Sequence, residues 1–245
     1  MSILDSIESG FQPRPHCVVV YGQPGIGKST FAAGAPKPLF IDCDNRTSHL
    51  DVSRVKPTSW ADVLDVFRAA CKPGFAFGTL VLDTLDHCEI LVHKHVCEQG
   101  GANDIIEAFG GYGKGYNAAQ AEWKRLSAGI DAVRASGINV ILLAHTHIRP
   151  FANPSGESWD RWVLKVHPRA SAFLQERVDA VGFAGFDDFG RVAKDIKKTV
   201  KGVTTGQRML QFVHSPAYES KPMAAYPEKC ALDWNSFVNN NKEIK

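Results

Sequence analysis

The chain has 245 residues, of which 44% are hydrophobic, and its formal net charge at pH 7 is only +2. This size and composition predict one large α/β domain, or a core with a small appendage, and the small charge excludes a polycation built as a whole for nucleic acid. No apolar run reaches the roughly 18 residues of a membrane span, and the N-terminus lacks a secretion signal. We therefore expect a cytoplasmic protein with no membrane partner.

Residues 22–29 match the phosphate-binding pattern G-x-x-x-x-G-K-[ST] without a mismatch. The flanks supply the context that this loop needs, because residues 16–21 are typical of a buried strand and residues 29–33 begin a helix. A glycine-rich turn without a ligand is the alternative, which the combination of strand, full pattern and helix disfavours. The residues that we expect to bind a nucleotide are Gly22, Gln23, Pro24, Gly25, Ile26, Gly27, Lys28, Ser29 and Thr30.

Two side chains of this loop have specific tasks in triphosphate chemistry. Lys28 is expected to reach the β- and γ-phosphates, and the Ser29 hydroxyl is placed to hold Mg²⁺. GTP is disfavoured because the chain contains no N-K-x-D base-reading motif. The predicted cofactors are therefore ATP and Mg²⁺.

Short apolar runs alternate with helical stretches along the chain, which is typical of a mostly parallel sheet covered by helices on both faces. Strands are expected at residues 17–21, 39–43, 79–82 and 138–144, and helices at residues 60–70 and 117–136. Shorter strands at residues 162–166, 179–183, 191–196 and 209–213 are expected to form an antiparallel extension of the same sheet. The loops at residues 100–115 and 145–160 are long, which is typical of functional or mobile segments. Residues 1–215 are the predicted core, and residues 216–245 are a mostly irregular tail that packs on it or extends from it.

Acidic residues end two of the predicted strands. The run at residues 79–83 has the form of a Walker B segment, so Asp83 is expected to act on Mg²⁺ through water, the alternative being a helix cap. Thr84 follows Asp83 where many related ATPases have Glu, so the hydrolytic carboxylate must come from elsewhere. By strand alternation Asp42 and Asp44 share a face, and Asp44 lies at the carboxyl end of its strand, where open α/β sheets bind ligands. Asp44 is the predicted water-activating group, and its short side chain predicts slow turnover.

The histidines and cysteines suggest a γ-phosphate sensor and, less strongly, a metal site. His145 follows the fourth predicted strand and is the expected sensor, and His147 is the second choice. A metal site formed by these two histidines is the alternative, but no third ligand lies nearby in sequence. On a helix only His93 and Cys97 of the group His93, His95 and Cys97 share a face, which leaves a zinc site short of ligands. The six cysteines form no C-x-x-C pair, so reduced thiols are expected.

These segments, in this order, resemble the RecA-like P-loop ATPase core, and more closely the phage AAA-type ATP-binding family that includes Sak-type single-strand-annealing recombinases. The segments are GQPGIGKST, LFIDCD, TLVLDT, GGYGKGYNAAQAEWKRL, INVILLAHTHIRPF, DRWVLKVHPRASAFLQERVDAVGFA and SPAYESK. The resemblance implies an ATP-dependent recombination protein that binds single-stranded DNA and assembles head to tail into a ring or filament. It further implies DNA-stimulated hydrolysis, the host cytoplasm as location if a phage encodes the chain, and a single-strand-binding protein as a candidate partner.

In RecA-like proteins the loop before the long helix and the loop after the sensor strand line the DNA channel. Carried over, these loops are residues 110–116 and 149–161, although the first also fits a flexible surface loop. Aromatic rings stack on bases and cations neutralise phosphates, so the expected DNA-binding residues are Tyr112, Lys114, Tyr116, Arg149, Phe151 and Arg161, with Trp159 adding to the second loop. The basic stripe from Arg191 to Arg208 fits either a phosphate-binding surface or a solvated hairpin face.

RecA-like ATPases also complete the site with basic residues from a neighbouring subunit. Lys165, Arg169 and Lys221 are the candidates in this chain. The aspartate at 44, where RecA-like proteins carry the catalytic glutamate, puts the rate of hydrolysis in doubt more than nucleotide binding. An ATP-switch protein, such as a helicase loader or replication accessory factor, is the alternative function, and a small-molecule kinase is disfavoured because no arginine-rich lid is visible.

Overall fold

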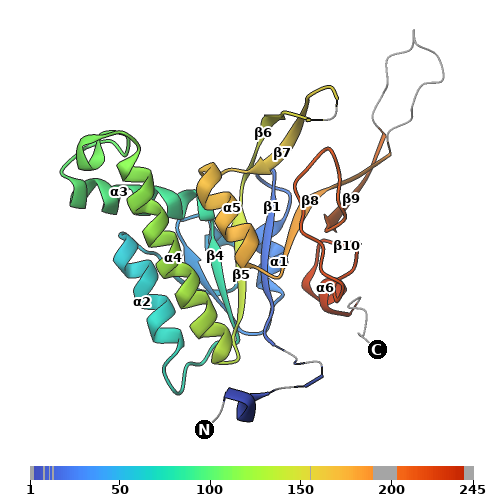
Figure 1. The fold of residues 1–245 in the computed structure, drawn as a ribbon. Helices are drawn as coiled ribbons and strands as arrows, with labels where there is room; N and C mark the ends of the chain where they lie inside the picture. Colours follow the sequence, from blue (N-terminus) through green and yellow to red (C-terminus); the bar gives the residue numbers. More distant parts are fainter. Residues whose placement is uncertain are drawn as a thin grey trace.

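A computed structural model describes residues 3–7, 9–10, 12, 14–154, 156–189 and 203–239. These residues form a three-layer α/β structure in which helices cover both faces of a central sheet (Figure 1). Among them, no helix combines the length and hydrophobicity that crossing a bilayer requires.

The central sheet has eight strands in the order β10-β9-β8-β1-β5-β4-β2-β3. They are β1 (Cys17–Gly22), β2 (Pro38–Asp42), β3 (Ser53–Val55), β4 (Thr79–Asp83), β5 (Asn139–Ala144), β8 (Ala180–Phe189), β9 (Val203–Gln211) and β10 (Lys229–Ala231). The strands from β8 to β3 run parallel, whereas β9 and β10 pair antiparallel at one edge. The predicted class, a mostly parallel sheet flanked by helices with an antiparallel C-terminal extension, is confirmed.

Two of the strands expected in that extension are placed differently. β8 is parallel to β1, and its first residues are buried on both sides as in an interior strand. The strand expected at residues 162–166 leaves the sheet and forms a separate hairpin of β6 (Thr146–Phe151) and β7 (Trp159–Leu164). The long loop predicted at residues 145–160 is therefore largely this hairpin. The strand expected at residues 191–196 lies outside the described residues.

The helices divide between the two faces of the sheet according to the alternation of its side chains. α2 (Trp60–Ala70), α3 (Leu85–Gly100), α4 (Lys114–Ala135) and α5 (Pro168–Arg177) cover one face, and α1 (Lys28–Ala33) and α6 (Trp234–Asn239) cover the other. Along β1, Cys17, Val19 and Tyr21 belong to the first core, while Val18 and Val20 belong to the second. All five are fully buried, which is why this strand reads as a continuous apolar run.

Helix starts follow the sequence closely where a cap is encoded. The predicted helix at residues 60–70 is confirmed as α2. It begins directly after Ser59 because Ser59 and Asp62 form a reciprocal capping box. α4 begins at Lys114, earlier than predicted, after Gly113 adopts a left-handed conformation with φ of 75°. Short 3₁₀ turns occur at η1 (Ile3–Ser6), η2 (Thr47–His49) and η3 (Ala108–Gly110).

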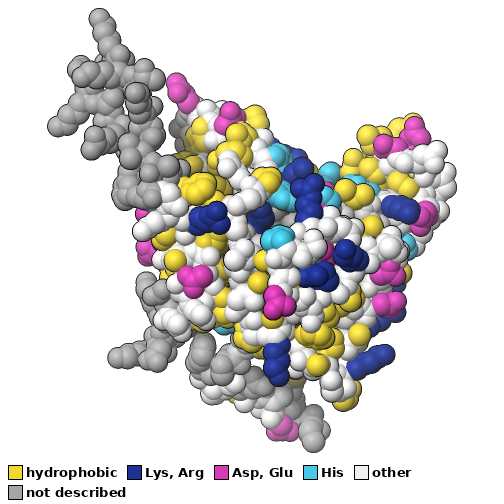
Figure 2. Space-filling model, turned by 180° about the vertical axis from the view of Figure 1, so that it is seen from behind, with side chains coloured by type: hydrophobic (Ala, Val, Ile, Leu, Met, Phe, Trp, Pro, Cys, Tyr) yellow, Lys and Arg dark blue, Asp and Glu magenta, His cyan; other side chains and the backbone are white. Residues whose placement is uncertain are grey.

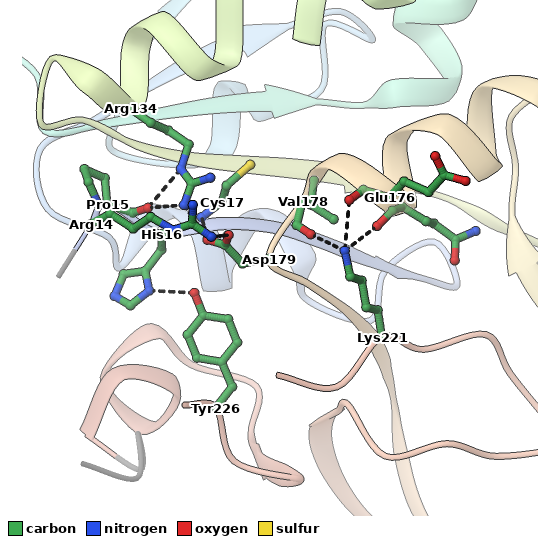
Figure 3. Close-up of polar contacts among 11 residues, drawn as sticks. Arg14, Pro15, His16, Cys17, Arg134, Glu176, Val178, Asp179, Lys221 and Tyr226 are labelled. Carbon is green, nitrogen blue, oxygen red and sulfur yellow. Dashed lines mark hydrogen bonds and ion pairs between the residues drawn. The ribbon is translucent and has the colours of Figure 1, made fainter. Parts of the chain in front are cut away.

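The segment after residue 215 packs on the core and contributes β10 and α6. Trp234 and Phe237 are buried against Phe31 of α1. The Tyr226 hydroxyl and His16 Nδ1 are joined by a hydrogen bond of 2.8 Å, beside the cluster in which Asp179 accepts hydrogen bonds from Arg14 and Arg134 (Figure 3). These contacts tie the C-terminal segment to the face of the sheet that carries α1.

Candidate nucleotide-binding site

The predicted phosphate-binding loop connects β1 to α1 at the carboxyl edge of the parallel strands. Gly25 and Gly27 have positive φ angles of 79° and 110°, which side chains other than glycine rarely tolerate. At Gly22, a Cβ would lie 2.3 Å from the Ala184 carbonyl oxygen of β8, so only glycine fits between these strands. The glycines are thus required by the shape of the loop.

Lys28 is folded back inside this loop. Its side chain is buried at 5% exposure, and Nζ donates to the carbonyl oxygens of Gly22 at 3.0 Å and Gln23 at 3.1 Å. Burial lowers the pKa of the amine. Within the described residues the ammonium group forms no ion pair. A buried cation held only by neutral carbonyls is suited to an anionic ligand such as a phosphate.

Ser29 and Asp83 form a pair of oxygen ligands beside Lys28. The Ser29 hydroxyl donates to Asp83 Oδ2 at 2.7 Å. Burial, together with the nearby charges of Asp44 and Asp42, raises the pKa of Asp83 to about 6. A divalent cation would relieve this cost, and hydroxyl and carboxylate oxygens are the ligands that Mg²⁺ prefers. These residues therefore fit the magnesium ion expected from the sequence.

The two aspartates after β2 have different environments. Asp42 ends the strand fully buried, and its carboxylate accepts hydrogen bonds from Thr47 Oγ1 at 2.6 Å and from the backbone N–H groups of Arg46 and Thr47. Those bonds outweigh the effect of burial and lower the pKa of Asp42. Asp44 lies beyond the strand, and burial together with its hydrogen bond to Asp42 raises its pKa. β2 ends at Asp42, so strand alternation does not extend to Asp44, but the hydrogen bond between the two carboxyl groups still places them side by side.

His145 follows β5 and is held by an acid that the sequence analysis missed. Its Nδ1 lies 2.9 Å from Asp86 Oδ2, and its backbone N–H donates to Asp86 Oδ1 at 3.0 Å. Burial alone would raise the pKa of Asp86, but the hydrogen bonds from His145 outweigh it and hold the pKa well below its usual range. The one signal in the sequence was that Asp86 lies in the first turn of the helix that follows Asp83.

A group with metal-ligand spacing also forms here, although not where the sequence suggested one. In the described part of the chain, His87 joins Asp86 and His145 in the only such group. His95 instead contacts Gln99, and the zinc site considered at residues 93–97 does not form.

A cavity of about 250 Å³ brings these groups together. Of the predicted residues, Lys28, Ser29, Asp44, Asp83 and His145 all line it. Its walls consist of Pro24, Gly25, Gly27, Lys28, Ser29, Thr30, Asp44, Arg46, His49, Asp83, Thr84, His145 and Arg208. Seen from behind, Lys, Arg and His side chains gather across the upper part of the molecule (Figure 2).

A sequence profile described as an AAA domain matches residues 14–222. The chain belongs to this family. A KaiC-like protein from the hyperthermophilic archaeon Pyrococcus horikoshii OT3 is similar over 81% of this chain and 78% of its own, with 13% sequence identity and a TM-score of 0.43. No curated protein matches the chain. The P-loop, its acidic partners and the family together identify an AAA-type ATPase domain.

The hairpin of this AAA domain gathers four of the residues considered for DNA on one face. The pairing of Arg149 with Arg161 and of Phe151 with Trp159 places all four side chains on the same side. The Arg161 guanidinium lies 4.2 Å from the centre of the Phe151 ring and donates to Glu219 at 2.7 Å. The charge of Arg161 is thus already neutralised. Arg149, Phe151 and Arg161 all line a cleft of about 180 Å³.

The other expected DNA residues lie at the start of α4. Tyr112 is 99% exposed just before the helix, and Lys114 is exposed in its first turn. Tyr116 stacks on His167 with ring centres 4.3 Å apart, so its ring is already engaged. Tyr112 and Lys114 are therefore the accessible members of this set.

The three basic candidates for action on a neighbouring subunit differ sharply. Lys165 and Arg169 are exposed, and Arg169 donates to Asn117 at 2.6 Å. Lys221 Nζ instead donates to three backbone carbonyls at the end of α5, those of Gln175, Glu176 and Val178 (Figure 3). Lys221 caps the end of α5 within its own subunit, so of the three candidates it is the least suited to act on a neighbour's nucleotide.

Of the basic stripe, only Arg208 belongs to the described side chains. Arg191, Lys194, Lys197, Lys198 and Lys201 lie outside the described residues.

Proposed function

We propose that this AAA domain is an ATP-dependent, single-stranded-DNA-binding recombination protein of the RecA-like, strand-annealing type, which couples Mg²⁺-dependent ATP hydrolysis to DNA binding and self-assembly. The observation that carries the proposal is that the chain runs directly from the nucleotide cavity into the hairpin. His145 follows the end of β5 and lines the cavity, and the next residue begins the hairpin that carries Arg149 and Phe151. A change at the cavity can therefore reach the candidate DNA surface directly.

The residues of the cavity support slow hydrolysis of ATP. Lys28 binds the β- and γ-phosphates, while Ser29 and Asp83 would hold Mg²⁺, which neutralises charge on the same phosphates. Asp44 orients and deprotonates the attacking water, and its raised pKa makes its ionised form a stronger base. Asp86 engages His145 Nδ1, which leaves Nε2 as the ring atom for a γ-phosphate oxygen.

A helix links the cavity to the second candidate DNA region. Asp86 and Glu89 lie three residues apart on α3, on one face of the helix. Asp86 holds His145, and Glu89 accepts hydrogen bonds of 2.9 and 3.0 Å from the His167 backbone N–H. His167 stacks on Tyr116, four residues after the exposed Tyr112. Loss of the γ-phosphate at His145 would thus affect both the hairpin and, through α3, the region around Tyr112 at the start of α4.

An ATP-switch protein is the second candidate, and the state of Asp44 favours it. The short side chain of an aspartate holds the attacking water farther from the γ-phosphate than a glutamate would. This feature favours a long-lived ATP-bound state over rapid turnover. Such a protein would change shape on binding ATP and require no DNA for hydrolysis.

One experiment separates the two. ATP hydrolysis is measured with and without single-stranded DNA, together with annealing of complementary strands and mass in solution with a non-hydrolysable ATP analogue. The recombination proposal expects DNA binding, stimulated hydrolysis, annealing that Lys28→Ala abolishes, and assembly with the analogue. ATP binding without any DNA binding or annealing would refute it and leave the switch.

A further inference from the structure

Arg208 reaches the phosphate-binding loop from a distant part of the chain. It lies on β9, at the antiparallel edge of the sheet, yet its side chain lines the cavity that holds Lys28 and Ser29. A Cβ built on Gly27 would lie 3.2 Å from Arg208 Nη1 and 3.8 Å from its Cδ. The guanidinium group therefore lies directly against the loop.

The C-terminal segment holds Arg208 in this place. The Arg208 carbonyl oxygen accepts a hydrogen bond of 3.0 Å from the Leu232 N–H, and the neighbouring Met209 pairs with Ala231 of β10. Leu232 itself approaches the loop, with Cδ2 3.6 Å from the Cβ position of Gly27. Arg208 also pairs with Phe186 of β8, so the backbone that positions the arginine is fixed on both sides.

Arg208 has no acidic partner among the side chains that the structure describes. Arg14 and Arg134 both pair with Asp179, and Arg161 pairs with Glu219, but no carboxylate with a described side chain lies within 4.0 Å of the Arg208 guanidinium. An arginine presents a fork of N–H donors that matches the oxygens of a phosphate. Because the Arg208 guanidinium lies against a loop whose backbone N–H groups cradle phosphates, this fork is placed to donate to phosphate oxygens bound there.

The position on the loop indicates which phosphates it would meet. Loop backbone groups such as the N–H of Gly27 cradle the α- and β-phosphates, whereas Lys28, Ser29 and Asp83 serve the γ-phosphate end. We propose that Arg208 binds the α- and β-phosphates of the nucleotide within its own subunit. Because ADP and ATP both carry these phosphates, Arg208 would bind both nucleotides. This proposal rests on the nucleotide binding proposed above, but not on DNA binding or assembly.

Calorimetric binding of ADP and of a non-hydrolysable ATP analogue tests the assignment. Arg208→Ala should weaken both nucleotides by about tenfold, because a charge-assisted hydrogen bond to phosphate is lost from each. Arg208→Lys should restore part of the affinity, since lysine keeps the charge but not the fork, and it serves as the test if Arg208→Ala does not fold. Arg68→Ala is the matched control, because Arg68 is an exposed arginine that pairs with Asp65 away from the cavity.

Three results would overturn the proposal. Unchanged affinity for both nucleotides would show that Arg208 is not a phosphate ligand. Unchanged ADP affinity with slower hydrolysis would assign it to the transition state instead. Recovered hydrolysis on mixing Arg208→Ala with Lys28→Ala protein would show that it acts on a neighbouring subunit. Wild-type protein that binds neither nucleotide would refute the proposed function itself.

Discussion

The nucleotide cavity and the candidate DNA surface differ in how firmly their side chains are held. In the cavity, Lys28, Ser29 and Asp83 are buried or half-buried, and each has a hydrogen-bond partner in the fold. On the DNA side, Tyr112 is 99% exposed and Lys114 projects from the first turn of α4. The first region is organised before its ligand arrives, whereas the second would be ordered by its ligand. Mutations should therefore have larger and more selective effects in the cavity.

Removal of the loop lysine is expected to have the largest effect. Lys28→Ala should weaken ATP binding by at least about 100-fold, because a buried, phosphate-directed cation is lost. The fold should survive, since the amine bonds only two loop carbonyls. Calorimetry measures the affinity and circular dichroism the fold, with Lys56→Ala, an exposed lysine, as control. Unchanged affinity would refute the assignment of the loop.

Asp42 and Asp44 are expected to have different roles, Asp42 in stability and Asp44 in hydrolysis. Asp44→Asn should slow hydrolysis by about 100-fold with ATP affinity nearly unchanged, because a general base is lost. Asp42→Asn should instead lower the denaturation midpoint, since Asp42 holds Thr47 and the Arg46 backbone. Steady-state kinetics and urea denaturation distinguish these effects. Wild-type turnover in Asp44→Asn would remove it as the base.

On the DNA side, the double variant Tyr112→Ala and Lys114→Ala should weaken single-strand binding by about tenfold. Its salt dependence should flatten by about 0.7 in slope, because one phosphate contact is lost. Lys124→Ala is the matched control, since Lys124 is an exposed lysine of α4 beyond its first turn. Fluorescence anisotropy at several salt concentrations gives both quantities. An equal loss in the control would show that the effect is not specific to the start of α4.

The smallest expected effect concerns Glu89 on the helix between the two regions. Burial and the nearby charge of Asp86 raise the pKa of Glu89 from its usual 4.5 to about 7. Between these values the folded protein binds a proton that the unfolded chain does not, so this group contributes stability at low pH that is lost as pH rises through 7.

Glu89→Gln cannot titrate, so its stability relative to wild type should increase by about 1 kcal/mol between about pH 5 and pH 8; this is well under the full shift because the side chain is partly exposed. Urea denaturation at both pH values measures the difference. A constant difference between variant and wild type would contradict the prediction.

Features encoded by local patterns could be predicted from the sequence, and features that depend on distant contacts could not. The phosphate-binding loop and the capping box of α2 depend on residues close in sequence. Asp83 and Asp44 could be placed because the carboxyl ends of parallel strands meet at one edge. Asp86 was missed because it lies on α3 and its partner, His145, follows β5 far along the chain.

Arginines and lysines show the same limit most clearly. Lys221 resembles any surface lysine in the sequence, and only the fold brings the three carbonyls of α5 around its amine. Arg208 belonged to a visible basic stripe, but its contact with Gly27 depends on the pairing of β8, β9 and β10. The hairpin of β6 and β7 was missed because its strands contain Pro150 and alternate irregularly in polarity.

The packing of α6 on α1 has a consequence for where this ATPase ends. The family match stops at residue 222, yet Trp234 and Phe237 shield the helix that begins with Lys28, and Leu232 steadies the strand of Arg208. A chain truncated at residue 222 would keep the phosphate-binding loop and the acidic residues of the cavity. It would lose the C-terminal side chains that pack against α1 and β9. A fragment that keeps the nucleotide cavity intact is therefore expected to extend beyond residue 222.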